Sequence, residues 1–247
     1  MKIRQIALVA GDLAAVRTQL FELLGIEEAF VDEAVSQFGL QNIVTAIGDT
    51  FLEVVSPVQE GTTAGRLLQR RGGDGGYMVI VQVADCSAAK ARLEKLGIRI
   101  VWEVDTGRAR ALHLHPRDVP GALPSLDEMD PPEAWYWAGP DWEQRAATLA
   151  CAITAAELQV DDPISAATRW ARAYNTDYRL EAGQPVIHME STEVRFVPVQ
   201  DHRGEGLRAI DIHTENLAEI LVHANRLGLP VAGESVTVCG TVFNFHR

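Results

Sequence analysis

The chain has 247 residues, of which 47% are hydrophobic, and a formal net charge of -12 at pH 7. This size suffices for a buried core, in one large domain or in two of about 120 residues. An acidic surface argues against nucleic acid and anionic membranes as partners. No apolar stretch reaches the roughly 18 residues of a membrane span, and the N-terminus lacks a signal-peptide pattern. We therefore expect a cytoplasmic protein, and the three scattered cysteines predict neither a disulfide framework nor a zinc site.

One structural unit is repeated four times along the chain. Each copy begins with an apolar strand, continues into a short helix that ends at Gly or Asn, and goes on to further strands. The copies start near Ile3, Tyr77, Leu158 and Leu207. Internal repeats of this kind determine the fold and are the first feature to identify. The sequence therefore predicts an α+β fold of tandem βαβββ modules.

The predicted helices carry clear signals at both ends. Asp12 is a good N-cap because its side-chain oxygen can accept a free backbone N–H, and Gly25 supplies the left-handed residue that ends the helix. The same pairs of signals predict further helices at 85–97, 162–175 and 214–228. Each helix has an apolar stripe that repeats with helical spacing, which predicts one buried face.

Short strands are predicted after each helix. They are expected at 42–47 and 50–56 in module one, at 99–104, 109–115 and 121–126 in module two, at 185–190 and 193–198 in module three, and at 236–239 and 242–246 in module four. The sequence stops after 242–246, so the fourth module is predicted to be incomplete and to lack its last strand.

A segment rich in Pro and Trp separates two halves. Residues 131–142 show no periodicity, which indicates an ordered linker within 129–147. The predicted division is then 1–128 for modules one and two, and 148–247 for a second, degenerate domain. The Trp residues of the linker either pack over a sheet edge or form a lid over a pocket.

Three features resemble the vicinal-oxygen-chelate superfamily, which includes glyoxalase I, bleomycin-resistance proteins, methylmalonyl-CoA epimerase and extradiol dioxygenases. They are the strand–Asp–helix–Leu-Gly openings, the stretch 49–57, and the His-Pro-Arg-Asp turn of 115–125. The similarity covers 3–126 well and 150–247 weakly, and is greatest with a glyoxalase-like group of unsettled activity. It implies that each pair of modules forms a half-barrel sheet with the helices outside.

The resemblance also implies four metal-ligand positions. Members hold one divalent metal through a His in the first strand, a Glu in the fourth, a His in the fifth and a Glu in the eighth. Counted from the helix-capping aspartates, these positions carry Gln5, Glu53, Met78 and Ser125 here. Only Glu53 is a strong ligand for such a metal, so we expect no metal cofactor.

A pocket on the concave face is still expected. Strand alternation places Gln5, Glu53, Met78 and Ser125 on one face, with Phe51, Ile80 and Gln82 beside them as substrate-binding candidates. A carboxylate on the apolar strand of Glu53 is costly to bury, and burial would raise its pKa into the range of a general base. The alternative is a structural network in which Glu53 is hydrogen-bonded to Gln5 and Ser125.

His113 is the second catalytic candidate. It joins Glu53 in the pocket if its face of the strand is the concave one, and otherwise it is a buried neutral imidazole. His115 is expected to shape the His-Pro turn. Arg66, Arg70 and Arg71 are placed to attract an anionic substrate tail, such as a CoA or a carboxylate.

Four functions remain open on these residues. The first is a metal-independent isomerase, epimerase or lyase in which Glu53 moves a proton next to a carbonyl, with Gln5, Ser125 or His113 orienting the substrate. The second is a protein of the bleomycin-resistance type that sequesters a ligand without changing it. The third is a metal-dependent lyase or dioxygenase with non-standard ligands. The fourth is a scaffold that dimerises through a sheet edge, so that both a monomer and a homodimer are compatible with the sequence.

Overall fold

The computed structural model describes all 247 residues and divides the chain into two compact units. The first unit consists of residues 1–4, 78–136 and 155–207. The second unit consists of residues 5–77, 137–154 and 208–247. None of the helices is long and apolar enough to cross a membrane.

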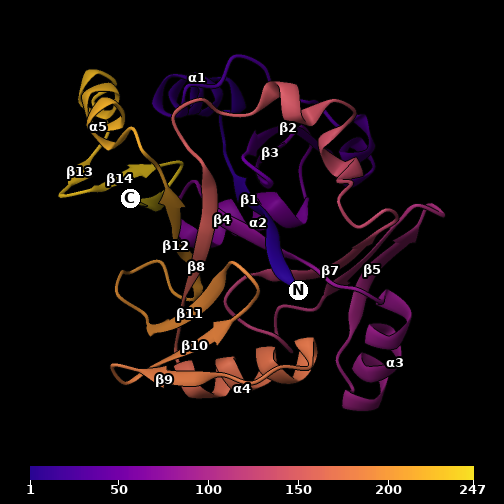
Figure 1. Cartoon of the computed structure of the whole chain (residues 1–247). Coiled ribbons are helices and arrows are strands. Elements are labelled where there is room, and N and C mark those ends of the chain that lie inside the picture. Colours follow the sequence, from indigo (N-terminus) through magenta and orange to yellow (C-terminus); the bar gives the residue numbers. More distant parts are fainter. The chain divides into compact units, whose positions relative to one another are not determined.

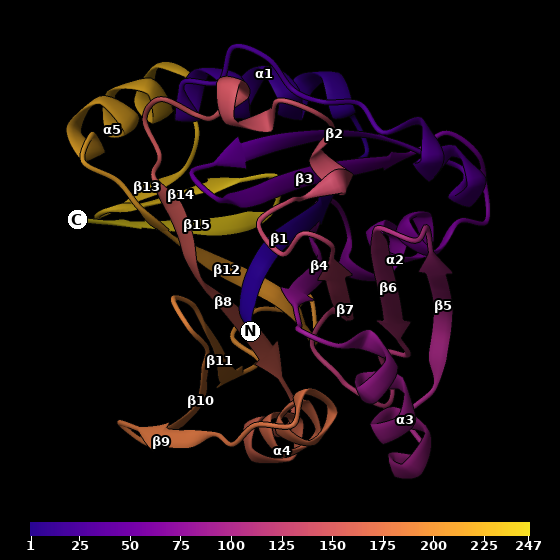
Figure 2. The same cartoon turned by 45° about the vertical axis from the view of Figure 1, so that its right-hand side comes forward.

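Module one supplies most of the second unit. Its elements are β1 (Lys2–Val9), α1 (Leu13–Leu24), the 3-10 helix η1 (Glu33–Phe38), β2 (Leu40–Ile47), β3 (Thr50–Pro57) and α2 (Thr63–Arg71). β3 lies between β1 and β2, parallel to β1 and antiparallel to β2. Helix α1 lies over these strands, with Val16, Leu20 and Leu23 buried beneath it (Figure 2).

Module four completes the second unit. Its elements are β12 (Gly206–His213), α5 (Leu217–Arg226), β13 (Val231–Ala232), β14 (Ser235–Val238) and β15 (Thr241–His246). The strands follow the order β13-β14-β15-β12, with β15 parallel to β12. Three strands therefore follow the helix, and the prediction that this module lacks its last strand is wrong. The strand β13, with only two residues, is too short to produce a periodic signal in the sequence.

The first unit combines modules two and three. Module two comprises β4 (Gly75–Gln82), α3 (Cys86–Leu96), β5 (Ile100–Asp105), β6 (Ala109–Leu114) and β7 (Leu123–Met129). Module three comprises β8 (Ala152–Val160), α4 (Pro163–Tyr174), β9 (Arg179–Glu181), β10 (Gln184–His188) and β11 (Glu193–Pro198). The strand orders are β4-β7-β6-β5 and β8-β11-β10-β9. Helix α4 packs along β10 and β11 (Figure 1).

These elements confirm the predicted α+β modules, and their sheets are open rather than closed into barrels. The predicted ends are present in three of the four helices, whereas the helix predicted at 214–228 begins after Asn216 without a side-chain cap. Asp12 accepts a hydrogen bond from Ala15 N at 3.0 Å, and Asp85 and Asp162 cap their helices in the same way. Gly25 ends α1 in the left-handed region at φ 66°, where a glycine is favoured.

Within each unit, specific contacts join two modules. In the second unit, Glu22 of α1 forms an ion pair with Arg226 of α5 at 2.7 Å. In the first unit, Trp170 Nε1 of α4 donates to Pro120 O at 2.7 Å. Module one thus packs with module four, and module two with module three. The division into domains 1–128 and 148–247 with a linker at 129–147 stays a prediction.

The Pro- and Trp-rich segment is ordered, and its residues make packing contacts within each unit. In the first unit, Trp135 is buried beneath the guanidinium group of Arg4, 5.6 Å from its ring centre. The segment contains the 3-10 helices η2 (Tyr136–Ala138) and η3 (Trp142–Arg145). In the second unit, Ala147 N donates to Ala46 O of β2 at 2.8 Å. The packing interpretation therefore fits the observed contacts.

Candidate active site around Glu53

Glu53 lies in the middle of β3, on one face of the three strands of module one. The register places it between Ala7 of β1 and Val44 of β2. Gln5 of β1 lies beside Phe51, one step along the same face. The side chain of Glu53 is only 7% exposed, so a carboxylate is buried among apolar neighbours.

Two amide groups hold the carboxylate. Gln5 Nε2 donates to Glu53 Oε2 at 2.9 Å, and Asn42 Nδ2 donates to Glu53 Oε1 at 2.7 Å. Asn42 is itself fixed, because its Oδ1 accepts a hydrogen bond from the backbone N of Asp32 at 3.0 Å. Each oxygen of the carboxylate thus has one N–H donor, and its orientation is defined.

The electrostatic environment raises the pKa of Glu53 above its ordinary value. Burial is the largest cause, and the hydrogen bonds from Asn42 and Gln5 oppose it without cancelling it. The negative charge of Asp32 adds to the rise. A carboxyl group with a raised pKa is one that accepts a proton more readily near neutral pH.

Tyr77, near the start of β4, belongs to residues 5–77 of the second unit, as Glu53 does, and carries a neutral phenol. Burial raises its pKa to about 12, the negative charge of Glu53 adds to this rise, and Arg66 of α2 opposes it. Tyr77 is therefore protonated at neutral pH and can donate a hydrogen bond. The sequence analysis did not single it out, because a Tyr on an apolar strand is an ordinary core residue.

An aromatic pair forms an apolar wall beside the carboxylate. Phe51 is fully buried, and its ring meets the ring of Trp142 edge to face, with centres 5.0 Å apart. Trp142 belongs to η3, in the segment predicted as a linker or a lid. The contact shows the segment packed on the strand that bears Glu53.

The remaining candidates from the sequence lie in the first unit. Ile80 of β4, Ser125 of β7 and His113 of β6 form one row across the sheet. Met78 and Gln82 lie on the same face of β4, two residues to either side of Ile80. The register thus places these five on one face of the sheet, and their roles in binding or catalysis stay predictions.

Ser125 belongs to a different network from the one expected. Its hydroxyl donates to Asp127, a buried carboxylate on the same strand. Tyr174 OH of α4 donates to Ser125 O at 3.1 Å, and burial followed by the charge of Asp127 raises the pKa of Tyr174. Of the structural network predicted for Glu53, the bond to Gln5 is present, while the Ser125 hydroxyl bonds to Asp127 instead.

His113 is a neutral imidazole at physiological pH. Burial lowers its pKa to about 4, and its ring packs against Trp102 with centres 4.5 Å apart. His115 accepts a hydrogen bond from Arg117 N at its Nδ1, which fits the expected role in shaping the turn.

Comparison with known proteins agrees with this architecture. The family model described as "Glyoxalase-like domain" matches residues 6–174, more than half of the chain. The chain belongs to the glyoxalase-like domain family.

Three individual proteins illustrate what this glyoxalase-like protein is similar to. An ethylmalonyl-CoA/methylmalonyl-CoA epimerase of Cereibacter sphaeroides is 25% identical over 132 residues, which cover 52% of this chain and 98% of the epimerase. A hypothetical protein of Staphylococcus aureus has the same fold, with a TM-score of 0.70, 13% identity and coverage of 99% of this chain and 98% of that one. A variant of 4-hydroxymandelate synthase from Streptomyces coelicolor gives a TM-score of 0.72, with 15% identity and coverage of 92% and 75%. The resemblance to the vicinal-oxygen-chelate superfamily is thereby confirmed, and the superfamily includes enzymes that act on small molecules.

The residues of this glyoxalase-like chain do not suit the divalent metal that the superfamily implies. The four ligand positions carry an amide, one carboxylate, a thioether and a hydroxyl, in Gln5, Glu53, Met78 and Ser125. No group of three or more His, Cys, Asp or Glu side chains is placed to hold a metal ion. In addition, both oxygens of Glu53 face N–H donors, which is the environment of a hydrogen-bonded carboxylate.

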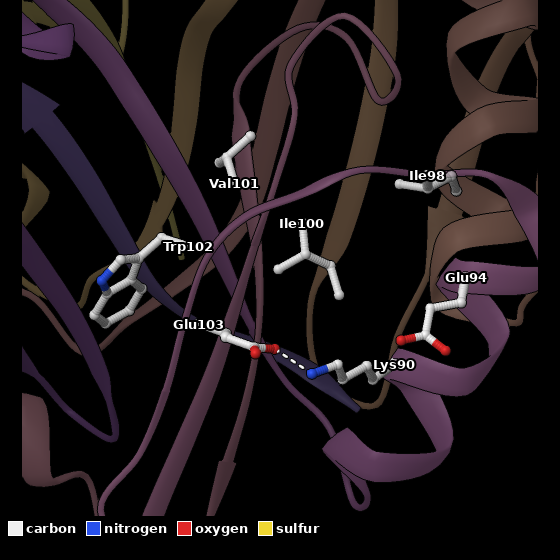
Figure 3. A pocket seen from close by; sticks show the side chains of 7 residues that line it. All are labelled: Lys90, Glu94, Ile98, Ile100, Val101, Trp102 and Glu103. Atoms are coloured by element: carbon white, nitrogen blue, oxygen red, sulfur yellow. Dashed lines mark hydrogen bonds and ion pairs between the residues drawn. The ribbon is translucent and has the colours of Figure 1, made fainter.

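A shallow groove of about 420 Å³ lies elsewhere, between α3 and β5 of the first unit (Figure 3). Its lining residues are Lys90, Glu94, Ile98, Ile100, Val101, Trp102 and Glu103. Lys90 and Glu103 neutralise each other across it at 2.6 Å. None of the residues predicted for the site lines this groove.

Asn42 and Asp127 are polar site residues that the sequence analysis missed. The signal for Asn42 was available in the two-residue Gly48–Asp49 turn, because that turn fixes the register of the hairpin. The register pairs Val44 with Glu53 and Asn42 with Val55, so that Asn42 and Glu53 share a face. Asp127 follows from the two-residue period after Ser125.

Proposed function

We propose that this glyoxalase-like protein binds a small carbonyl compound beside Glu53, and that Glu53 removes a proton from the carbon next to the carbonyl group. The reaction is an isomerisation, epimerisation or elimination that needs no metal. The observation that carries the proposal is a carboxylate with a raised pKa, buried on an apolar strand and held by two amides.

The chemistry follows from this environment. Removing a proton next to a carbonyl leaves negative charge on the carbonyl oxygen and a neutral carboxylic acid on the base. A desolvated site favours the neutral acid, and a base is most effective when its pKa is near the working pH. The developing charge on oxygen needs a donor, and within the second unit the protonated phenol of Tyr77 is a candidate in addition to Gln5.

An acyl-CoA thioester is the first substrate class to test. The support is the similarity to the epimerase, which acts on ethylmalonyl-CoA and methylmalonyl-CoA. The proton that such an enzyme moves is the one that Glu53 is proposed to take. Arg66 of α2, whose charge acts on Tyr77, is a group that would attract an anionic substrate.

Ligand sequestration without catalysis is the second candidate. It is favoured by the two amide hydrogen bonds to Glu53, which lower its pKa and so weaken it as a base, while each carboxylate oxygen keeps a lone pair for a ligand. In that case Glu53 anchors a cation or a hydroxyl group of the ligand, and Phe51 with Trp142 supplies an apolar wall.

The test is solvent deuterium exchange into a panel of carbonyl compounds that includes acyl-CoA thioesters. The wild type is compared with Glu53→Gln and with Glu103→Gln, a control that removes an exposed carboxylate in the first unit. We expect exchange with the wild type and the control, and a rate at least about 100-fold lower with Glu53→Gln. Equal exchange by all three proteins would contradict the role of Glu53. Thermal stabilisation of the wild type by a ligand, without any exchange, would support sequestration instead.

A further inference from the structure

We propose that Asn42 is a positioning residue for Glu53, which turns one carboxylate oxygen toward a fixed N–H donor and keeps the group ionised and oriented. This inference rests on the proposed function only for its consequence in catalysis. Asn42 lies on β2, and Glu53 lies on the neighbouring strand β3. Neither composition nor the family resemblance assigns a role to this residue.

The geometry fixes the amide of Asn42 in one orientation. A backbone N–H can only donate, so the N–H of Asp32 requires the oxygen of the amide, and the two are 3.0 Å apart. The Nδ2 group must then face Glu53, where it lies 2.7 Å from Oε1. A flip of the amide would break both bonds and place oxygen against oxygen at the carboxylate.

The buried position makes this bond a strong one. Asn42 is 2% exposed and Glu53 is 7% exposed, so little water is available to replace the amide donor. Three charged or titratable residues, Asp32, Tyr77 and Arg66, interact with Glu53 or with each other here. The charge of Asp32 raises the pKa of Glu53. The charge of Glu53 raises the pKa of Tyr77, and the charge of Arg66 lowers it. Among the opposing effects on Glu53, the bond from Asn42 is the largest one that favours the carboxylate.

The bond also links the carboxylate to the segment that leads into η1. Asp32 caps η1 through its side chain, which accepts from Ala34 N, while its backbone N–H holds Asn42. The position of Glu53 is therefore tied to the start of η1 through one side chain.

The direct test is the pH titration of Glu53 itself, monitored by NMR of ¹³C-labelled glutamate carboxyl groups. The Glu53 signal is assigned as the one that is absent from the spectrum of Glu53→Gln. Asn42→Leu keeps the approximate volume and removes the donor. We expect the pKa of Glu53 to rise by about one to two units in this variant, the equivalent of a hydrogen bond to a charged group. Thr45→Val is the matched control, since Thr45 lies on the opposite face of β2 and donates within the core to Leu52 O at 3.0 Å.

Asn42→Asp keeps the experiment informative if Asn42→Leu fails to fold. It retains an acceptor for Asp32 N–H and replaces the donor by a second carboxylate, so the pair should titrate in two steps, the upper one above the wild-type value. A Glu53 pKa within about 0.3 units of the wild type in Asn42→Leu, or a shift as large in Thr45→Val, would overturn the inference. If Glu53 shifts as expected but the wild type exchanges no deuterium, the positioning by Asn42 stands and the proposed function fails. If both hold, the pH profile of exchange in Asn42→Leu moves upward with the pKa.

Discussion

Glu53 and His113 are buried titratable side chains, and burial shifts their pKa values in opposite directions because it disfavours whichever form is charged. The neutral form of Glu53 is the acid, so its pKa rises. The neutral form of His113 is the base, so its pKa falls to about 4. The two residues therefore affect stability at different ends of the pH scale.

Glu53 should destabilise the folded protein increasingly as the pH rises. The unfolded carboxyl titrates near 4.5, and the folded one above it, so between these values the folded state binds more protons. Each unit of difference costs about 1.4 kcal/mol of the free energy of unfolding once the pH exceeds both values. We expect Glu53→Gln to gain stability relative to the wild type between pH 4.5 and pH 8, as measured by urea unfolding. A relative loss over this range would show that the folded pKa is lowered instead.

His113 should destabilise the protein as the pH falls. The unfolded imidazole gains its proton near pH 6.5 and the folded one only near 4, so stability is lost between these values. We expect His113→Phe to remove about 2 kcal/mol of this loss by pH 4.5, relative to pH 7. Urea unfolding of both proteins at the two pH values measures it. An unchanged pH dependence in the variant would mean that the imidazole is accessible to water when folded.

Single residues were predictable where one residue type decides the outcome. The capping aspartates and the buried Glu53 could be identified from local pattern alone. The partners of Glu53 were harder, because Asn42 comes close only through the pairing of β2 with β3. Ser125 was placed on the right face, but its hydroxyl bonds to Asp127, which local pattern does not decide.

At the scale of elements, the β2–β3 hairpin determines the site because its register brings Asn42 to Glu53. Its turn contains Gly48 at φ 59°, and a Cβ there would lie 1.9 Å from the backbone oxygen of Cys151. Gly107 in the β5–β6 turn has φ 81° and no atom within 4 Å of such a Cβ. The two glycines thus share the conformational constraint and differ in the steric one.

Gly48→Ala should therefore be far more destabilising than Gly107→Ala. In both variants an alanine must adopt a left-handed conformation, which costs free energy. Only in Gly48→Ala must the backbone at Cys151 also move. We expect the free energy of unfolding to fall by at least about 2 kcal/mol more in Gly48→Ala, measured by urea unfolding. Similar losses in the two variants would show that the chain near Cys151 yields without cost.

Strands were less predictable than helices, for reasons of length. Helices α1, α3 and α4 carry a cap, a stripe and a left-handed end over 11 or 12 residues. The strand β13 has two residues and is defined by its pairing with β14, so module four appeared incomplete. Module one also contains an element that was not predicted, the 3-10 helix η1 before β2.

At the scale of the whole molecule, repeats identified the family, whereas the packing contacts between modules within each compact unit were not evident from them. The contacts join module one to module four and module two to module three, for example through Glu22 with Arg226 and Trp170 with Pro120. Those contacts connect residues far apart in the sequence, and a repeat pattern does not indicate which modules make such contacts.

A fragment of residues 1–128 tests this pairing. It retains α1 but lacks α5 and β14, which pack against α1 in the second unit. We expect the fragment to be markedly less stable to urea than the full chain, and to recover when it is mixed with 129–247. A fragment that unfolds alone with the stability of the full chain would support the division 1–128 and 148–247 as independent domains.

The most direct test of the central claim is deuterium exchange by protein purified without chelator or affinity nickel, with its metal content measured in parallel. The wild type and Glu53→Gln are assayed before and after treatment with a chelator. Our account predicts that the wild type exchanges the proton next to a carbonyl equally well after metal removal, and that Glu53→Gln does not. Stoichiometric Fe, Mn, Ni or Zn that is lost in Glu53→Gln, together with exchange abolished by the chelator, would contradict it and indicate a metal-dependent enzyme with unusual ligands.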